Sequence, residues 1–265
     1  MSTRALRTAA SGLYAQQVNI EVIANNIANV NTTGFKKNKA EFQDLMYQEE
    51  LVNPVTSNLP GVEDTNIKIQ VGNGVKPSTA QKIFLQGDIT ATNNQLDVAI
   101  QGDGFFQIRK PDGNYVYTRD GSFKINADGR VVTTNGHTLD PEVTLDDDTL
   151  SVIISRDGVV ESEQAGGGRM VLGNIELVKF MNPAGLKALG DNLYAETESS
   201  GQPLIGTPGS SGFGEIHQGY LESSNVDIVE EMISMITAQR AYEINSKTVK
   251  TVEEMMTMAN NLKQA

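Results

Sequence analysis

Apolar residues recur every seven positions at the start of the chain. One series is Leu6, Leu13, Ile20 and Ile27, and a second series of Ala9, Gln16, Ile23 and Val30 follows it by three positions. This spacing predicts an amphipathic helix with an a/d seam of the coiled-coil type over about four heptads. The helix is expected to end at 32–34, because Gly34 suits the left-handed position that follows many helices.

The end of the chain has the same kind of pattern. One series is Ile228, Met235, Tyr242, Val249 and Met256, and Met232, Gln239 and Ser246 stand four positions after its first three members. Ser224 followed by Asp227 resembles a capping box at a helix start. We therefore expect a second long helix from about 226 to 262.

Polar residues interrupt both seams and leave two interpretations open. Gln16 and Gln239 occupy seam positions, and asparagines crowd the first helix. Polar seam residues usually select register and partner at a cost in stability, and such helices are marginal without external packing. The helices could pair within one molecule, or they could pack between copies of the chain in a polymer.

We adopt the polymer as the working hypothesis. The residues expected to pack between subunits are Leu6, Leu13, Ile20, Ile23, Ile27, Val30, Ile228, Met232, Met235, Gln239, Tyr242, Val249 and Met256, with Asn25 and Asn26 fixing the register.

The middle of the chain changes to short β-like runs separated by turn dipeptides. Asp-Gly occurs at 103–104, 112–113, 120–121, 128–129 and 157–158, and Asn-Gly occurs at 135–136. Turn signals at this density between apolar runs predict consecutive β-hairpins. An antiparallel β body is therefore expected over 86–225.

The expected fold class is α+β, with long coiled-coil-type helices at both termini flanking a predominantly antiparallel β body. Segments 1–35 and 226–265 would form an inner polymerisation domain, and 86–225 an outer one. Residues 36–85 would connect these two domains. They would include an extended loop-like excursion at about 46–66 that is rich in Pro, Ser, Asn and Gly.

Charge is distributed unevenly along the chain. The formal net charge is -12, of which residues 1–35 carry +1, residues 226–265 carry -2 and the middle carries -11. Nearly neutral ends can pack against copies of themselves, while an acidic body stays solvated. The acidic balance also argues against nucleic acid as a partner.

Targeting signals and catalytic chemistry are not evident. No run approaches the roughly 18 apolar residues of a membrane span, and Gln16, Gln17 and Asn19 interrupt any secretory h-region, so neither membrane insertion nor a cleaved signal peptide is expected. The chain has no Cys, and its two histidines, His137 and His217, lack neighbours at ligand spacing. We expect no catalytic residues, metal or cofactor.

Both ends resemble bacterial flagellar rod and hook proteins. The N-terminal likeness is the run VIANNIANVNTTGFK at 22–36, and the C-terminal likeness comprises SNVD at 224–227 and QRAYEINSK at 239–247. Two central runs, GDGFF at 102–106 and YTRDGSF at 117–123, resemble the central hairpins of the family. The likeness therefore covers essentially the whole chain.

Within that family the chain is most similar to members that build the distal rod. The similarity rests on its length, on the run FQDLMYQ at 42–48 with the excursion after it, and on the string at 239–247. The alternatives are a proximal rod or hook subunit of the same family and, from a different class, a hydrolase of cell-wall glycan.

The resemblance implies a rigid helical tube that transmits motor torque across the periplasm to the hook. It implies export through the flagellar type III apparatus without a cleaved signal peptide, with the terminal helices lining the tube. The implied partners are further copies of the chain, proximal rod proteins, the hook protein or hook–rod junction, the surrounding P and L ring proteins and the export apparatus.

Overall fold

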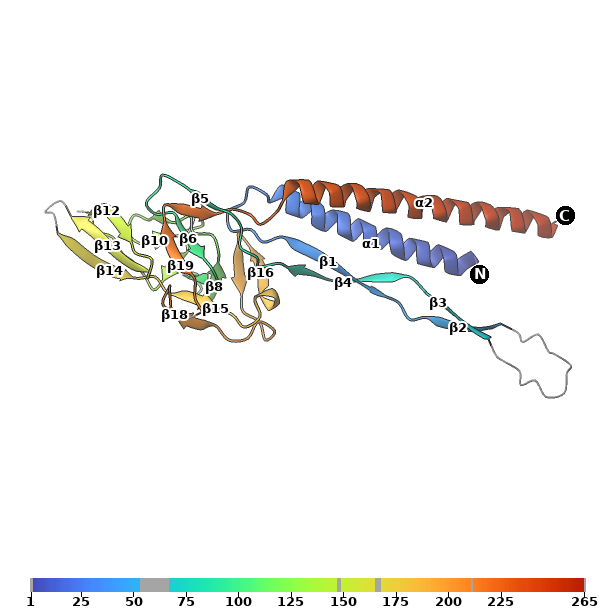
Figure 1. Ribbon diagram of the computed structural model, residues 1–265, viewed down its shortest axis with the longest axis horizontal. Coiled ribbons are helices and arrows are strands. Elements are labelled where there is room, and N and C mark those ends of the chain that lie inside the picture. Colours follow the sequence, from blue (N-terminus) through green and yellow to red (C-terminus); the bar gives the residue numbers. More distant parts are fainter. Residues whose placement is uncertain (1, 53–66, 147–148, 165–167, 211, 265) are drawn as a thin grey trace. The chain divides into compact units, whose positions relative to one another are not determined.

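The chain divides into two compact units. The computed structural model describes residues 2–52, 67–146, 149–164, 168–210 and 212–264. Unit 1 consists of Met1–Asn25, Asn38–Gln81 and Val229–Ala265, and unit 2 consists of Asn26–Lys37 and Lys82–Ile228. The expected α+β composition is confirmed: along the sequence, a helix at each end precedes or follows a set of mostly antiparallel strands (Figure 1).

The elements follow one another along the chain in this order: α1 Ser2–Ala28, β1 Asn38–Asp44, β2 Gln48–Val52, β3 Ile67–Val71, β4 Val75–Lys82, β5 Ile89–Ala91, β6 Val98–Gln101, β7 Phe105–Arg109, β8 Tyr115–Thr118, β9 Lys124–Ile125, β10 Val131–Val132, β11 Thr138–Asp140, β12 Thr149–Ile154, β13 Val159–Gln164, β14 Arg169–Asn174, β15 Leu177–Lys179, the 3-10 turn η1 Pro183–Gly185, β16 Lys187–Gly190, β17 Leu193–Ala195, β18 Leu204–Gly206, β19 Glu215–Gln218, β20 Tyr220–Glu222 and α2 Ile228–Gln264.

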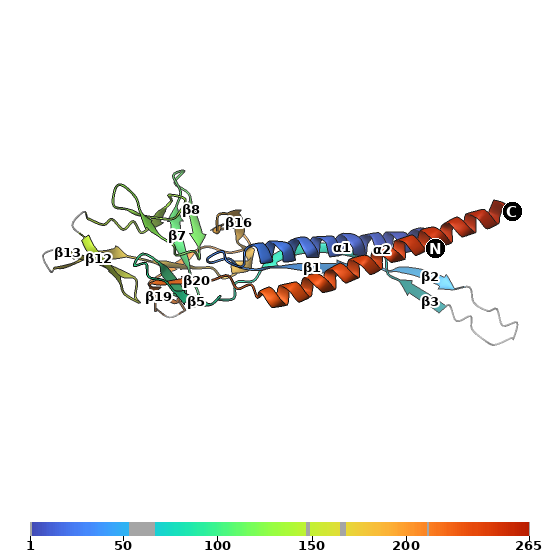
Figure 2. The ribbon, with the colours of Figure 1, turned by 90° about the horizontal axis from the view of Figure 1, so that it is seen from above.

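Unit 1 combines the two helices with a two-part β ribbon. Helices α1 and α2 run side by side in Figure 1, and in Figure 2 α2 crosses α1; the N-terminus of α1 and the C-terminus of α2 lie at the same end in both views. A Cβ on Gly12 would lie 3.0 Å from Asn245 Nδ2, which marks a close approach of the two helices. In the ribbon, β1 pairs with β4 and β2 pairs with β3.

The ribbon is anchored on α1 by Ser11. Its hydroxyl accepts a hydrogen bond from Val75 N at 3.2 Å and donates one to Thr8 O at 2.7 Å. Gly74 has φ +112°, and a Cβ there would lie only 2.1 Å from Ser11 Oγ. A side chain at position 74 would therefore push the ribbon off the helix.

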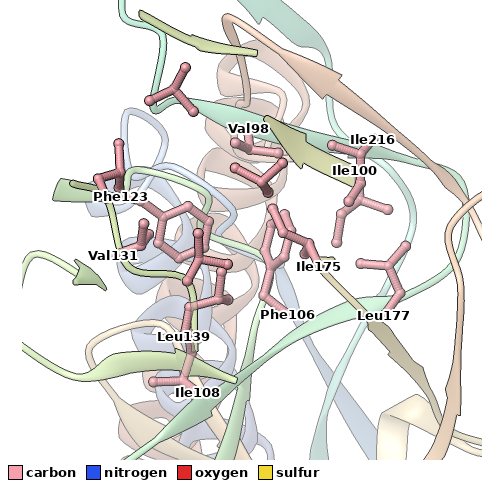
Figure 3. Close-up of a cluster of buried hydrophobic side chains, with 14 of the residues drawn as sticks. Val98, Ile100, Phe106, Ile108, Phe123, Val131, Leu139, Ile175, Leu177 and Ile216 are labelled. Atoms are coloured by element: carbon pink, nitrogen blue, oxygen red, sulfur yellow. The ribbon is translucent and has the colours of Figure 1, made fainter. Parts of the chain in front are cut away.

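Unit 2 is built around a nine-stranded sheet. Its main path runs β16-β17-β8-β7-β11-β10-β9, and β15 joins it at β7 and carries β18. A three-stranded sheet β12-β13-β14 and the pairs β19-β6 and β20-β5 complete the unit. Side chains from the separate sheets meet in one core, where Phe106, Ile108 and Leu177 are fully buried (Figure 3).

Four of the six turn dipeptides form the expected hairpins. The turns at 112–113, 128–129, 135–136 and 157–158 join the antiparallel pairs β7-β8, β9-β10, β10-β11 and β12-β13. The expectation was wrong at 103–104 and 120–121, because β6 pairs with β19 and β8 pairs with β7 and β17.

The glycines of those two dipeptides lie where neighbouring atoms leave little room for a side chain. A Cβ on Gly121 would lie 1.6 Å from Val98 O, and one on Gly104 would lie 3.2 Å from Leu177 Cδ1. Gly121 therefore lies against backbone, whereas Gly104, with φ +148°, lies against a side chain. Close approach of another backbone is a known reason for glycine next to strands, and it produces the same dipeptide as a hairpin turn.

The first helix ends earlier than expected. Helix α1 stops at Ala28, and the next residues form a tight turn in which Val30 N donates to Ile27 O at 3.3 Å. Gly34 is left-handed as expected, with φ +68°, but its N–H donates to Glu222 O at 2.8 Å and not to the helix end. A tertiary contact therefore fixes this glycine.

The connecting segment contains more strand than expected. Residues 48–52, expected at the start of the loop-like excursion, form strand β2, which pairs with β3 at 67–71. This pairing joins two segments that are well separated in the sequence, and no local pattern indicates it. The remainder of the excursion, 53–66, lies outside the described residues.

Candidate assembly surface

The expected inter-subunit residues fall into three groups. Ile23 and Asn26 are buried; Leu6, Leu13, Ile20, Ile27, Val30, Met235, Val249 and Met256 are half-buried; Asn25, Ile228, Met232, Gln239 and Tyr242 are exposed. Val30 belongs to the turn after α1 and not to a helix seam.

Part of both helical seams is used within the single chain. On α2 the buried residues are Glu231, Ala238 and Val252, separated by seven and fourteen positions, and Asn245 on the same face meets Gly12 of α1. On α1, Ala9, Ala15 and Ile23 are buried. The interpretation that the helices pair within one molecule therefore accounts for one face of each.

A second face of α2 is uncovered in the chain. We call it the α2 outer stripe, and its apolar members, each more than half exposed, are Val229, Ile233, Ile236, Ile244, Met255, Met258 and Leu262. At 100° per residue these positions lie on the side of α2 away from Ala238. Exposed apolar surface that gathers on one face is typical of interaction sites.

The sequence pattern did not single out the outer stripe. The seven-residue series ran through α2 along other positions, and the exposed isoleucines fell between them. An eleven-residue spacing, as from Ile233 to Ile244 to Met255, is the signal that could have found it.

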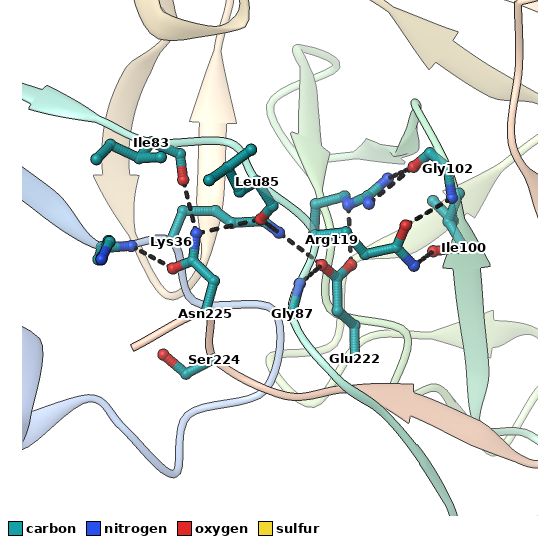
Figure 4. Close-up of polar contacts among 12 residues, drawn as sticks. Lys36, Ile83, Leu85, Gly87, Ile100, Gly102, Arg119, Glu222, Ser224 and Asn225 are labelled. Atoms are coloured by element: carbon teal, nitrogen blue, oxygen red, sulfur yellow. Dashed lines mark hydrogen bonds and ion pairs between the residues drawn. The ribbon is translucent and has the colours of Figure 1, made fainter. Parts of the chain in front are cut away.

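Unit 2 contains a second feature that the sequence pattern missed, a buried charge cluster. It brings together Lys36, Arg119 and Glu222, whose side chains are 1%, 6% and 0% exposed (Figure 4). Lys36 Nζ lies 2.5 Å from Glu222 Oε1, and Arg119 Nε lies 3.0 Å from Glu222 Oε2. Lys36 and Arg119 belong to the N-terminal and central runs on which the family resemblance rests, and Glu222 lies two positions before the C-terminal run at 224–227.

Backbone groups complete the cluster. Gly87 N donates to Glu222 Oε1 at 3.0 Å, Lys36 Nζ donates to Leu85 O at 2.6 Å, and Arg119 Nη1 donates to Gly102 O and Gly104 O at 2.9 and 2.6 Å. These bonds satisfy the guanidinium and ammonium groups away from water, as buried charges require.

The cluster holds two cations and one carboxylate, and this imbalance bears on the pKa of its lysine. Burial lowers the pKa of Lys36, and the paired Glu222 carboxylate opposes that shift. Burial also lowers the pKa of Lys82, whose ammonium group lies 5.0 Å from the centre of the Phe35 ring. The single carboxylate of Glu222 is therefore the group that makes the buried positive charge tolerable.

Asn225 ties the C-terminal run to the same region. Its Nδ2 donates to Ile83 O at 2.9 Å and Leu85 O at 3.1 Å, and its Oδ1 accepts from Lys37 N at 2.7 Å (Figure 4). Together with the charge cluster, this side chain joins the residue before β1, the segment after β4 and the segment before α2.

A cavity of about 230 Å³ adjoins the charge cluster. Lys36, Arg119 and Lys179 contribute to its lining, and Lys179 Nζ pairs with Asp103 Oδ2 at 2.8 Å. Among the residues that the structure describes, no group of three or more His, Asp or Glu side chains could hold a metal ion. None of the described helices has the length and apolar character needed to cross a lipid bilayer.

Three family models match along the chain. The "Flagella basal body rod protein" model matches residues 6–36, the "Flagellar hook protein FlgE/F/G D1 domain" model matches 99–162, and the "Flagellar basal body rod FlgEFG protein C-terminal" model matches 217–262. These matches cover α1, the central strands and α2. They define a structural protein of the flagellar rod and hook class.

Full-length relatives place the chain within that class. It is 50% identical over 266 residues to the flagellar basal-body rod protein FlgG of Borreliella burgdorferi, covering 98% of this chain and 99% of the relative. It is 38% identical to FlgG of Bacillus subtilis, with 98% and 99% covered, and 36% identical to FlgF of Caulobacter vibrioides, with 89% and 88% covered. The chain belongs to the flagellar basal-body rod protein FlgG family.

One solved structure shows a limited likeness. The crystal structure of Helicobacter pylori flagellar hook protein FlgE2 matches with TM-score 0.25 and 16% identity, over 71% of this chain and 43% of that one. The family assignment rests on the sequence relatives. It confirms the resemblance to rod and hook proteins, and it identifies a structural protein and not an enzyme, which removes the glycan hydrolase alternative.

Proposed function

We propose that this chain is the distal rod subunit, which polymerises through α1 and α2 into a rigid helical tube. The observation that carries the proposal is the α2 outer stripe, an apolar face on a helix whose opposite face already packs within the chain. Each apolar side chain fully removed from water contributes roughly 1.5–3 kcal/mol. Several such side chains per subunit would make the contact between subunits stiff.

In this proposal α1 and α2 pack in a coiled-coil manner along the tube, and the half-buried seam residues become fully covered. The acidic body stays solvated on the outside. The tube crosses the periplasm and transmits torque to the hook. Its subunits reach the tube through the flagellar export apparatus without a cleaved signal peptide. Proximal rod proteins, the hook or hook–rod junction and the P and L rings are its proposed neighbours.

The relatives favour a rod subunit of the FlgG kind over a proximal rod or hook subunit. Identity to FlgG proteins reaches 50% over nearly the full length, compared with 36% to FlgF over a smaller share. The distal position is our proposal within that family.

Replacing Ile236 with Asp tests the polymer. Ile236 is 51% exposed in the chain, so the substitution should leave the fold intact while placing a charge in the subunit contact. We expect straight tubes from the unaltered chain in negative-stain electron microscopy and monomers from Ile236→Asp.

Met170→Asp provides a matched control. Met170 is 50% exposed on β14 in unit 2, so it undergoes the same chemical change outside the proposed contact. Tubes from the control together with monomers from Ile236→Asp support the proposal. Tubes from Ile236→Asp, or monomers from the unaltered chain at high concentration, would refute it.

A further inference from the structure

The α2 outer stripe has its own sequence period. Positions 229, 240, 251 and 262 are spaced by eleven, as are 233, 244 and 255, and 236, 247 and 258. Eleven residues complete about three turns of helix, so all these positions share one face along the whole length of α2. This face is continuous, and it is distinct from the face that packs on α1.

The chemistry of the stripe changes along its length. Its two ends are apolar, whereas its middle contains Arg240, Lys247 and Thr251, all exposed. Within the part of the chain that the structure describes, neither Arg240 nor Lys247 forms an ion pair. A partner that covers this stripe must therefore bring negative charge to its middle and accept bulky apolar side chains on either side.

Helix α1 has an exposed face of the complementary kind. Its members Arg7, Ala10, Tyr14, Gln17, Glu21 and Ala24 alternate in steps of three and four and are all exposed. Glu21 is the one acidic residue in Ser2–Ala28, and Gln17 Nε2 donates to its Oε1 at 3.1 Å. The alanines leave room for large side chains of an opposing helix.

The two faces cannot satisfy one another inside one molecule. Each lies away from the contact marked by Gly12 and Asn245, which holds α1 and α2 together through their other faces. A second copy of the chain presents both faces again. A contact between two different faces is heterologous, and it generates an open helical assembly when the rotation does not close.

We infer that the α2 outer stripe of one copy packs on the exposed face of α1 in a second copy, with Glu21 opposite Arg240 and Lys247. This inference rests on the proposed function, because it names the partner surface of the same polymer. Opposite charges at the centre set the alignment of the two helices, and the isoleucines around them fill the spaces beside Ala10 and Ala24.

Charge reversal on each side tests the pairing. We expect the single variant Glu21→Arg and the double variant Arg240→Glu/Lys247→Glu each to weaken polymerisation. In each variant the concentration at which half of the protein sediments as polymer should rise by about tenfold or more, because like charges would then face each other. Combining all three substitutions should restore sedimentation to near that of the unaltered chain. Lys250→Glu, the same kind of change at an exposed α2 position outside the stripe, is the matched control and should change little.

The outcomes separate the two proposals. Loss in each reversed variant and recovery in the combination support the pairing, since a merely structural defect would not be repaired by further charge changes. Polymerisation of Glu21→Arg at the concentration of the unaltered chain would overturn the pairing and leave the polymer intact. A monomeric unaltered chain would overturn the proposed function, and the pairing with it.

Discussion

Replacing Glu222 with Gln should destabilise unit 2 strongly. The substitution keeps the size of the side chain but removes the one carboxylate that lies against Lys36 Nζ and Arg119 Nε. Two cations with side chains 1% and 6% exposed would then remain in the interior. Breaking a buried pair by removing one partner costs about 3–5 kcal/mol, because the remaining charge is uncompensated.

The loss can be measured by thermal and urea unfolding. For a unit of this size, 1 kcal/mol corresponds to roughly 2–4 °C, so the melting temperature should fall by roughly 6–20 °C. The chain has no Trp. The near-ultraviolet circular dichroism of the buried Tyr117 and Tyr194 therefore reports on unit 2, while the far-ultraviolet signal follows the helices.

Two companion variants make the reasoning refutable. Glu163→Gln is the same change at an exposed carboxylate that accepts a hydrogen bond from Ser151 at 2.9 Å, and it should cost less than about 0.5 kcal/mol. Lys36→Met removes the excess cation and leaves the Arg119–Glu222 pair, and Leu85 O keeps its bond from Asn225. It should cost only about 1–2 kcal/mol. A cost for Glu222→Gln within about 1 kcal/mol of zero, or below that of Lys36→Met, would refute this account.

Two further predictions concern unit 2. Burial raises the pKa of Tyr117 and Tyr194 to about 12, so between about pH 10 and 12 the unfolded chain loses phenolic protons that the folded chain keeps. The free energy of unfolding should therefore fall with rising pH in that window. Tyr194→Phe should reduce the slope of this free energy against pH by up to about 1.4 kcal/mol per pH unit, measured by urea unfolding at a series of pH values. An unchanged slope would contradict the assignment. Gly121→Ala should cost about 4 kcal/mol or more, because its Cβ would lie 1.6 Å from the backbone oxygen of Val98. The control Gly113→Ala, with φ +80° and no neighbouring atom within 4 Å, should cost about 1–2 kcal/mol in the same unfolding assay, and equal losses would show that contact distance does not decide the effect.

Features that depend on neighbours in sequence were predictable. The two helices follow from apolar spacing, and four hairpins follow from turn dipeptides whose strands adjoin them. The turns at 103–104 and 120–121 were misassigned because the same dipeptide also allows close packing, of Gly104 against the Leu177 side chain and of Gly121 against the backbone of Val98, which only the folded chain shows. The end of α1 was misplaced for a similar reason, since Gly34 is held by Glu222.

The candidate surface was only partly predictable. A seven-residue spacing identifies a face of a helix, but it does not say whether that face is covered by the same chain or by another one. Ile23 is covered within the chain, whereas Ile228 and Met232 are exposed. The buried charges left no local signal either, because lysine and arginine are usually exposed and their partner lies far along the chain.

The charge cluster also affects the order in which the chain can fold. Lys36 and Glu222 are 186 positions apart, and Glu222 lies just before the last helix. A chain that emerges from its N-terminus must keep the ammonium group of Lys36 in water until nearly all other residues have arrived, since burying it alone is costly. The bond between them therefore closes late, and a chain truncated before Glu222 would lack the means to complete unit 2.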